Sequence, residues 1–538
     1  MRYGLSKVGM GFIAAALLLA GCATGGDRQA GDPGSDTARS DGGFEFKDGP
    51  ICTDEAPGDP VAGGTLTLAM LTEPPAIDPA VTRPPAATGG VEVLAVFEPL
   101  LRYDPAAKKY VPQLAEAVEA NDDFSQYTVT LREDATFSDG SPVDAEAVKW
   151  SMERYAKTPT APDGALWNSS VSAVEVTDER TVQITLAKPW STFEVMLSLG
   201  PGMIVAPSSG AGEAFTPIGA GPFVLDKHVP RESITMSANE KYWAGKPHLE
   251  GVRFIYLGSA QTNIETLQSG GAQVAMLRSP NQVQDLFAED EYCGSMAMIG
   301  GGAVLQINAD EGRPGSDPRV RKALQLAIDP KVVYERAFDG KGIHSSSLFP
   351  EYSQWHTEQQ GLEPDPEEAK RLIEEAKADG FDGTVKYLGT SSGQDVALAV
   401  QAQWEAVGLT VEVDLLRSVP EQVERIFKKD YDTVYWAVGI MESDVYGRLS
   451  AALHSDGNQL FGTATTPERD ALIDKFRSAP DAESQQRILN ELQQSINDDV
   501  PFVSLGAMSD VLAWPKNVHG IEPAGYGTVL LGRAWIAP

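Results

Sequence analysis

Cysteine and histidine are both scarce in this chain. Only three of its 538 residues are cysteine, too few for a disulfide scaffold, so burial of apolar side chains must hold the fold together. The six histidines are scattered, without a pair at helical spacing, and no Cys-x-x-Cys motif is present. Because a transition-metal site normally needs clustered His or Cys ligands, the sequence does not indicate a metal site.

Positive charge is also in short supply. The chain has 43 Lys and Arg against 76 Asp and Glu, a formal net charge of −33. Nucleic-acid binding depends on neutralising phosphates with basic side chains, so this balance excludes a nucleic-acid partner. The hydrophobic share of 42% and the charged share of 22% are typical of globular proteins. At this length a single core no longer grows, which predicts two or more lobes.

No stretch of 18 consecutive apolar residues occurs in the chain. Near the N-terminus a short apolar segment, residues 10–20, follows two basic residues, and it is too short to cross a bilayer. It ends in Leu-Ala-Gly-Cys at residues 19–22, which resembles the bacterial lipobox, where a peptidase cuts before a cysteine that carries lipid. We predict a lipoprotein signal peptide over residues 1–21, with lipid on Cys22 as the membrane anchor. An ordinary cleavage site with a chance cysteine is the alternative.

Residues 22–61 are rich in Gly, Asp, Pro and Ser and have almost no periodic apolar positions. This composition predicts a flexible acidic tether. Cys52 lies in the tether, and Cys293 lies far downstream. In an oxidising compartment the two could form a disulfide that clips the tether to the body. The sequence leaves this pairing open, because a disulfide needs Cα atoms about 4.4–6.8 Å apart.

The remaining chain alternates between strand and helix patterns. Residues 64–70 alternate as a half-buried strand. In the second half, helical patterns at 366–378 and 396–407 alternate with strands at 384–387 and 410–415. Strands alternating with helices of this length predict an α/β fold. No repeat of 20–50 residues is present, which argues against a solenoid or a propeller.

Eight motifs, in order and spacing, resemble the family 5 extracellular solute-binding proteins, which serve ABC importers of peptides, nickel and related solutes. In the first half they lie at 112–116 (Pro-Gln-Leu-Ala-Glu), 127–132 (Tyr-Thr-Val-Thr-Leu-Arg), 137–143 (Phe-Ser-Asp-Gly-Ser-Pro-Val) and 147–151 (Ala-Val-Lys-Trp-Ser). Further along they lie at 217–225, 239–243, 317–329 and 400–409. The resemblance covers about residues 62–538.

The resemblance implies an α/β, two-lobed periplasmic-binding-protein-like fold of type II, similar to cluster C, with an extra subdomain inserted in lobe I. We place lobe I at 62–305 plus 502–538, its inserted subdomain at about 96–214, and lobe II at 306–501. Two crossings, near Asn308 and Pro501, would form the hinge. The ligand would lie between the lobes, which close around it.

The resemblance also suggests where the charged end of a ligand binds. In peptide-binding relatives, an acidic residue in the loop after the strand at 432–437 holds the α-amino group of the peptide. Glu442 falls nearest that position, and Asp444 is the alternative by register. A carboxylate in a closing, drying cleft makes a charge-assisted hydrogen bond to an ammonium group. Both acids could instead belong to a solvated surface loop. Three flanking aromatic residues could stack on the ligand or belong to the core: Tyr435, Trp436 and Tyr446.

Dipeptide-binding relatives also carry an arginine, shortly before the helix that contains Trp404, which takes the free carboxylate of the ligand. In this chain the corresponding stretch, residues 391–395, has no arginine. This departure puts a short free peptide in doubt and favours a longer, modified or non-peptide ligand.

The sequence offers little support for an enzyme, because His-Glu-x-x-His and a phosphate-binding loop are both absent. We therefore predict a lipid-anchored, monomeric binding protein on the extracytoplasmic side of the membrane, without catalysis or cofactor. It would capture a solute, most simply an oligopeptide, and deliver it to the permease subunits of an ABC importer. The alternatives are a non-peptide solute such as a modified peptide, an oligosaccharide or a metal chelate, a sensing role, and a secreted hydrolase.

Overall fold

The computed structural model describes residues 44–53 and 58–538, and all of them belong to one compact unit. The predicted signal peptide 1–21, the predicted lipidation site Cys22 and the predicted tether as far as residue 43 lie outside the described residues. Within the described part of the chain, no helix has the length and apolar character needed to cross a membrane.

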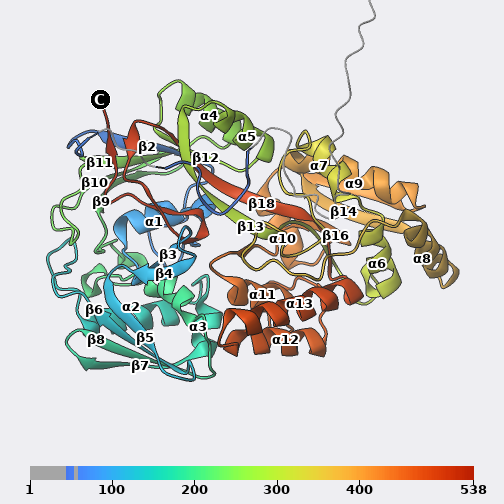
Figure 1. Ribbon diagram of the computed structural model, residues 1–538, viewed down its shortest axis with the longest axis horizontal. Helices are drawn as coiled ribbons and strands as arrows, with labels where there is room; N and C mark the ends of the chain where they lie inside the picture. The colour runs from blue at the N-terminus through green and yellow to red at the C-terminus, as the bar shows by residue number, and fades with distance from the viewer. Residues whose placement is uncertain (1–43, 54–57) are drawn as a thin grey trace, which may run out of the picture. The chain divides into compact units, whose positions relative to one another are not determined.

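The largest element of the fold is a mixed sheet of twelve strands (Figure 1). Ten of them follow one another across the sheet in the order β15 (Thr410–Leu416), β14 (Thr384–Thr390), β16 (Thr433–Trp436), β13 (Tyr292–Ile307), β18 (Phe502–Pro515), β12 (Val274–Leu277), β2 (Thr65–Met70), β11 (Gly251–Tyr256), β10 (Ser233–Ala238) and β9 (Phe223–Val229). Two short strands, β1 (Gly49–Pro50) and β17 (Ile440–Met441), also pair with β13.

The long strands β13 and β18 join the two halves of this sheet. They pair antiparallel from Tyr292 opposite Pro515 to Gln306 opposite Phe502. The glycines at 300–302 lie inside β13. A bulge changes the register there, and Gly301 adopts a φ of +54°, where a Cβ would come within 2.8 Å of the side chain of Leu348. The strand is buried on both faces, so it lacks the period-two pattern that marks a half-buried strand.

Helices cover the strands at one end of the sheet (Figure 1). Four of them are α6 (Pro318–Leu326), α8 (Pro366–Ala378), α9 (Gln394–Ala406) and α10 (Val419–Phe427), and α8 and α9 confirm the helices predicted at 366–378 and 396–407. Their starts follow from local chemistry, since the side chain of Asp317 accepts a hydrogen bond from the amide of Arg319 (2.8 Å) and that of Asp365 from the amide of Glu368 (3.0 Å). Trp404 of α9 is fully buried, and its Nε1 donates to the carbonyl of Leu324 at 3.0 Å.

A separate four-stranded sheet falls within the predicted inserted subdomain. Its strands are β5 (Ala115–Ala120), β6 (Gln126–Leu131), β8 (Thr181–Leu186) and β7 (Val171–Asp178), and α2 (Ala145–Lys157) and α3 (Gly164–Ser170) lie beside it. Asp144 is the N-cap of α2, and its side chain accepts a hydrogen bond from the amide of Ala147 at 2.8 Å. A hairpin of β3 (Leu101–Asp104) and β4 (Lys109–Pro112) precedes this sheet. The lobe and subdomain boundaries themselves stay predictions.

Residues 44–53, which we call the strap, are packed against the body. Strand β1 pairs with β13, with Gly49 opposite Met296 and Pro50 opposite Ser295. Cys52 forms a disulfide with Cys293, and their Cα atoms are 5.2 Å apart. The ring of Phe44 stacks on Phe287 at 5.7 Å. For these residues the structure differs from the predicted flexible tether, because a few apolar side chains and the disulfide provide contacts that the Gly- and Asp-rich composition conceals.

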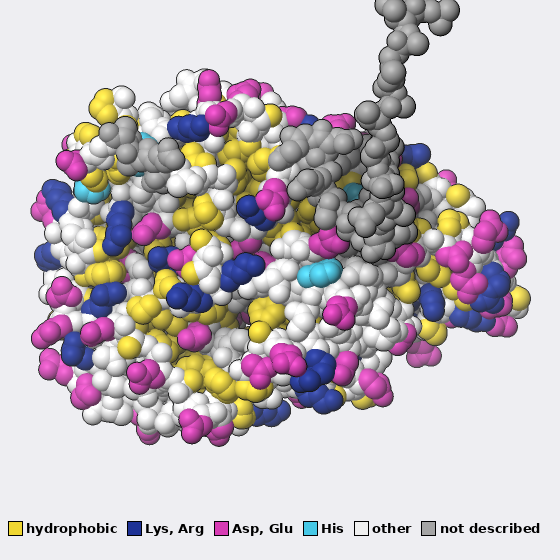
Figure 2. All heavy atoms as spheres, in the orientation of Figure 1, with side chains coloured by type: hydrophobic (Ala, Val, Ile, Leu, Met, Phe, Trp, Pro, Cys, Tyr) yellow, Lys and Arg dark blue, Asp and Glu magenta, His cyan; other side chains and the backbone are white. Residues whose placement is uncertain are grey.

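The surface agrees with the low content of basic residues. Figure 2 shows Asp and Glu side chains spread over the visible face, with Lys and Arg scattered among them. Two of the most exposed large apolar side chains are Val419 and Phe427, the first and last residues of α10.

Candidate functional site

The predicted ligand loop lies between β17 and α11 (Val445–Leu453). Strand β17 pairs with β13, with Met441 opposite Ile299, and this fixes the start of the loop. The chain then turns sharply, and the amide of Asp444 donates to the carbonyl of Met441 at 3.0 Å. Glu442 therefore projects from a tight turn that is held by the sheet on one side and by a helix on the other.

Hydrogen bonds hold both the side chain and the backbone of Glu442. Its Oε2 accepts from the backbone amide of Gln354 at 3.1 Å, and its carbonyl accepts from Nε1 of Trp355 at 3.0 Å. The amide group of the Gln354 side chain bridges the Glu442 carbonyl (3.1 Å) and the hydroxyl of Tyr103 (3.0 Å). Burial raises the pKa of Glu442 above its usual value, although hydrogen bonds from Ser353 and Gln354 and the positive charge of Lys108 oppose the shift.

Glu442 lines a narrow cavity, which we call the Glu442 cavity. It has room for roughly one water molecule. The segments that line it are far apart in the chain, and the lining residues are Asp48, Tyr103, Pro105, Ser295, Met296, Ala297, Met441, Glu442, Ser443, Ala524, Gly525 and Tyr526. Several separate segments of the chain therefore meet at this cavity, which has room for one small group of a ligand and not for a whole solute.

Asp48 of the strap places a second carboxylate on this cavity. Its Oδ1 accepts a hydrogen bond from the amide of Met298 at 3.0 Å. Burial raises the pKa of Asp48 to about 7, the negative charge of Glu442 adds to that increase, and Lys108 opposes it. The two carboxylates therefore interact, with a single basic side chain near enough to affect them both.

Asp444 has a structural role. One of its oxygens caps α11 by accepting from the amide of Gly447 at 3.0 Å, and the other accepts from the hydroxyl of Tyr526. The residue is 6% exposed, and it is not among the residues that line the Glu442 cavity. Both oxygens are thus engaged within the protein, and of the two candidates only Glu442 faces the cavity.

The three predicted aromatic contacts do not line this cavity either. Tyr446 is buried in the core, with its ring 4.9 Å from that of Trp190 and with the guanidinium of Arg477 5.5 Å above it. Tyr435 and Trp436 are half-buried on β16, opposite Leu305 and Val304 of β13.

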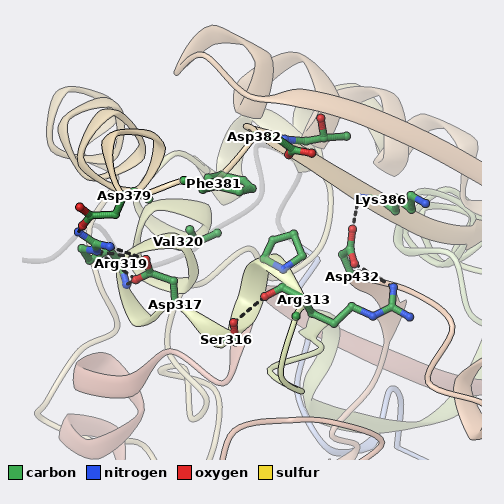
Figure 3. A pocket seen from close by; sticks show the side chains of 15 residues that line it. Arg313, Ser316, Asp317, Arg319, Val320, Asp379, Phe381, Asp382, Lys386 and Asp432 are labelled. Carbon is green, nitrogen blue, oxygen red and sulfur yellow. Dashed lines mark hydrogen bonds and ion pairs between the residues drawn. The ribbon is translucent and has the colours of Figure 1, made fainter.

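A larger and more open pocket lies elsewhere, at α6, the end of α8 and β14 (Figure 3). Its charged side chains already pair with one another: Arg319 contacts Asp317 and Asp379 at 2.7 Å each, and Arg313 contacts Asp432 at 3.1 Å. None of the predicted site residues lines it. Its charges therefore hold neighbouring loops together, and we do not assign the ligand to it.

One hydrolase-like pattern was missed in the sequence. Gly389-Thr-Ser-Ser-Gly393 matches Gly-x-Ser-x-Gly, and it lies between strand β14 and helix α9, as a nucleophile elbow would. The conformation does not fit that role, because Ser391 lacks the strained positive φ of such an elbow. Its hydroxyl donates to the carbonyl of Leu416 at 3.2 Å. Among the described residues, no cluster of three or more His, Cys, Asp and Glu is placed to hold a metal ion.

The fold matches a known class of protein. A solved structure of the periplasmic binding protein AgaA from A. tumefaciens R10, in complex with agropinic acid, is 26% identical with a TM-score of 0.73 over 88% of this chain and 99% of that one. The fold is thus that of the periplasmic binding proteins. The family model for bacterial extracellular solute-binding proteins, family 5 Middle, matches residues 109–459, and the chain belongs to this family.

Curated relatives agree with this assignment. The glutathione-binding protein GsiB of Salmonella paratyphi A is 26% identical over 431 residues, covering 76% of this chain and 82% of the relative. The probable D,D-dipeptide-binding periplasmic protein DdpA of Escherichia coli is 24% identical over 474 residues, covering 85% and 90%. The resemblance predicted from the motifs is confirmed, and the chain is a solute-binding protein of the ABC-importer type.

Most residues around Glu442 could not be predicted. Sequence analysis did not find Asp48, Tyr103, Gln354, Trp355 or Tyr526. They come from separate segments and form no local motif. Only Asp48 carried a usable signal, since it stands four residues before Cys52 and a disulfide to Cys293 would bring it to the body.

Proposed function

We propose that this protein captures a solute with a free ammonium group, most simply a peptide, and that Glu442 binds that group. The observation that supports this is a half-buried carboxylate on a cavity, where the ion pairs of the described residues include neither Glu442 nor Asp48. A buried carboxylate without a cationic partner is costly, and an ammonium group from the ligand would compensate it.

The names of the relatives support a peptide-like solute, since one is called glutathione-binding and another D,D-dipeptide-binding. The agropinic acid in AgaA and the lack of arginine at 391–395 keep a modified or non-peptide solute as the second candidate. In both cases the protein would bind and release the solute unchanged, as a monomer. Native mass spectrometry of the purified protein would identify a co-purified solute directly, and a chemically altered solute would contradict this proposal.

Substitution of Glu442 tests the ammonium site. We expect Glu442→Gln to weaken binding of peptides with a free amino terminus by about 1–3 kcal/mol, because a charge-assisted hydrogen bond is lost. Isothermal titration with such peptides and with their N-acetylated forms measures the effect, and the acetylated forms should bind both proteins equally weakly. Glu351→Gln, at an exposed carboxylate on a neighbouring loop, is the matched control. Equal affinity of Glu442→Gln and wild type for these peptides would show that Glu442 does not bind the ammonium group.

We further propose that Cys22 carries a lipid, so that the body is held at the outer face of the cell membrane. We also propose that lobe I (62–305 and 502–538, with the subdomain 96–214) and lobe II (306–501) move about a hinge where β13 ends and β18 begins. The contact between the amide of Ile307 and the carbonyl of Pro501, at 3.4 Å, supports that position, because the two crossings meet there.

A further inference from the structure

We propose that the strap is part of the ligand site: Asp48 and Glu442 together hold one primary ammonium group, and the disulfide Cys52–Cys293 keeps Asp48 in place. This inference rests on the proposed function and adds a second carboxylate, contributed by a segment that precedes the family's matched region at 109–459.

Strands β1 and β17 pair one after the other with the same edge of β13. Pro50 and Gly49 of β1 lie opposite Ser295 and Met296, and β17 begins its pairing opposite Ile299. The amide of Met298 falls in the gap between these two pairings, and the side chain of Asp48 accepts its hydrogen at 3.0 Å. Because the strap and the ligand loop are neighbours along this edge, Asp48 and Glu442 face the same cavity.

The strap is fixed by contacts on both sides of Asp48. On one side Phe46 is buried in a cluster with Ile264 and Leu267, and on the other the amide of Ile51 donates to Gly294 at 2.9 Å. The disulfide of Cys52 follows directly. A side chain held in this way is preorganised, so little conformational entropy is lost when a ligand binds to it.

The charges around Asp48 favour a cation. The titratable groups that act on it or share its cavity are Glu442, Lys108, Tyr103, Tyr352 and Tyr526. Of these only Lys108 is basic, and it makes no ion pair with either carboxylate. The hydroxyl of Tyr352 is buried and has no hydrogen-bond partner within the described part of the chain, and burial together with the charges of Glu442 and Asp48 raises its pKa.

The size of the cavity restricts the cation. Room for roughly one water molecule is enough for a primary ammonium group, whereas a quaternary ammonium or a guanidinium group is larger. An ammonium group shared by the two carboxylates would also provide the cation that both lack, since neither belongs to an ion pair of the described residues although each accepts a backbone hydrogen bond. Because burial and Glu442 raise the pKa of Asp48 to about 7, binding of the cation should displace a proton near neutral pH.

The test uses the full-length protein and a synthetic pool of peptides of two to six residues, offered both with free and with acetylated amino termini. Equilibrium dialysis with mass spectrometry measures the bound fraction at pH 6, 7 and 8. For wild type we expect the affinity for free-amino peptides to rise about tenfold from pH 6 to pH 8, because Asp48 loses its proton over this range. Asp48→Asn should bind about tenfold more weakly at pH 8 and lose most of the pH dependence.

Two controls distinguish loss of the Asp48 carboxylate from a general disturbance of the strap. Glu45→Gln changes an exposed carboxylate in the same segment that pairs with Lys47 at 2.8 Å, and it should behave as wild type. The double variant Cys52→Ser, Cys293→Ser, or wild type under mild reduction, should also bind free-amino peptides more weakly. Combining either change with Asp48→Asn should weaken binding little further. Circular dichroism verifies that each variant is folded.

The outcomes are distinguishable. If wild type retains neither peptide class, or retains both equally, the proposed ammonium site fails, and this inference fails with it. If Glu442→Gln weakens binding while Asp48→Asn keeps the affinity and the pH dependence of wild type, the proposed function stands and the role of the strap is overturned.

Discussion

Glu442 and Asp444 are two residues apart in one loop, yet their surroundings differ. Both carboxylate oxygens of Asp444 accept hydrogen bonds, from the amide of Gly447 and the hydroxyl of Tyr526, whereas Glu442 lines the cavity. The sequence indicated an acidic residue in this loop but not which of the two faces the ligand side. That distinction depends on the capping geometry of α11, which residue type and spacing do not determine.

Buried carboxylates also affect stability, and Glu92 of α1 (Gly90–Val96) is the clearest case. It is fully buried, its Oε1 accepts from the hydroxyl of Tyr256 at 3.1 Å, and its Oε2 has no partner in the described residues. Burial raises the pKa of Glu92 to about 8. Between its unfolded and folded pKa the folded state holds the extra proton, so this residue lowers the free energy of unfolding as the pH rises.

We therefore expect Glu92→Gln to flatten the pH dependence of stability. The neutral amide resembles the protonated acid, so the variant should gain stability relative to wild type by up to about 1.4 kcal/mol per pH unit between pH 5 and pH 8. Urea unfolding followed by circular dichroism at several pH values measures this difference. Glu133→Gln, at an exposed carboxylate, should leave the wild-type profile unchanged. A constant difference between Glu92→Gln and wild type would contradict the buried-proton explanation.

At the scale of elements, the sequence predicted the helices and strands that have one buried face and one polar face. Helices α8 and α9 and strand β15 have one buried face and recognisable ends, so their periodicity is visible. Strand β18 was missed because almost every residue in it is buried. Helix α11 was missed because its cap belongs to the ligand loop and Gly447 lies within its first turn.

The strap is the element whose contacts can be tested by stability. The disulfide Cys52–Cys293 spans 241 residues, and a cross-link that closes a long loop restricts the unfolded chain. We expect its removal by the double serine variant to lower the free energy of unfolding by about 2–5 kcal/mol. Urea unfolding with and without a reducing agent measures this, and the reducing agent should have no effect on the variant. An unchanged midpoint for reduced wild type would show that the cross-link does not stabilise the fold.

At the scale of the whole molecule, charge and anchoring belong together. With a net charge of −33, the protein is repelled by an anionic membrane surface and would not bind it unaided. Residence at the membrane then requires the lipid proposed on Cys22. We expect Cys22→Ala to release the protein from the membrane fraction, and Triton X-114 partitioning should move it from the detergent phase to the aqueous phase. If the wild-type protein itself partitioned into the aqueous phase, the proposed lipid anchor would be contradicted.

The sequence by itself determined the α/β alternation, the strong excess of acidic residues and the family, because these depend on local periodicity, composition and short motifs. The tertiary structure decided that Glu442 rather than Asp444 faces the cavity, and that Asp48 lies beside it. The first depends on the cap of α11, and the second follows from strand pairing along β13, which joins segments hundreds of residues apart. Such pairing leaves no local pattern, since each partner contributes only a few residues and the contact exists only in the folded chain.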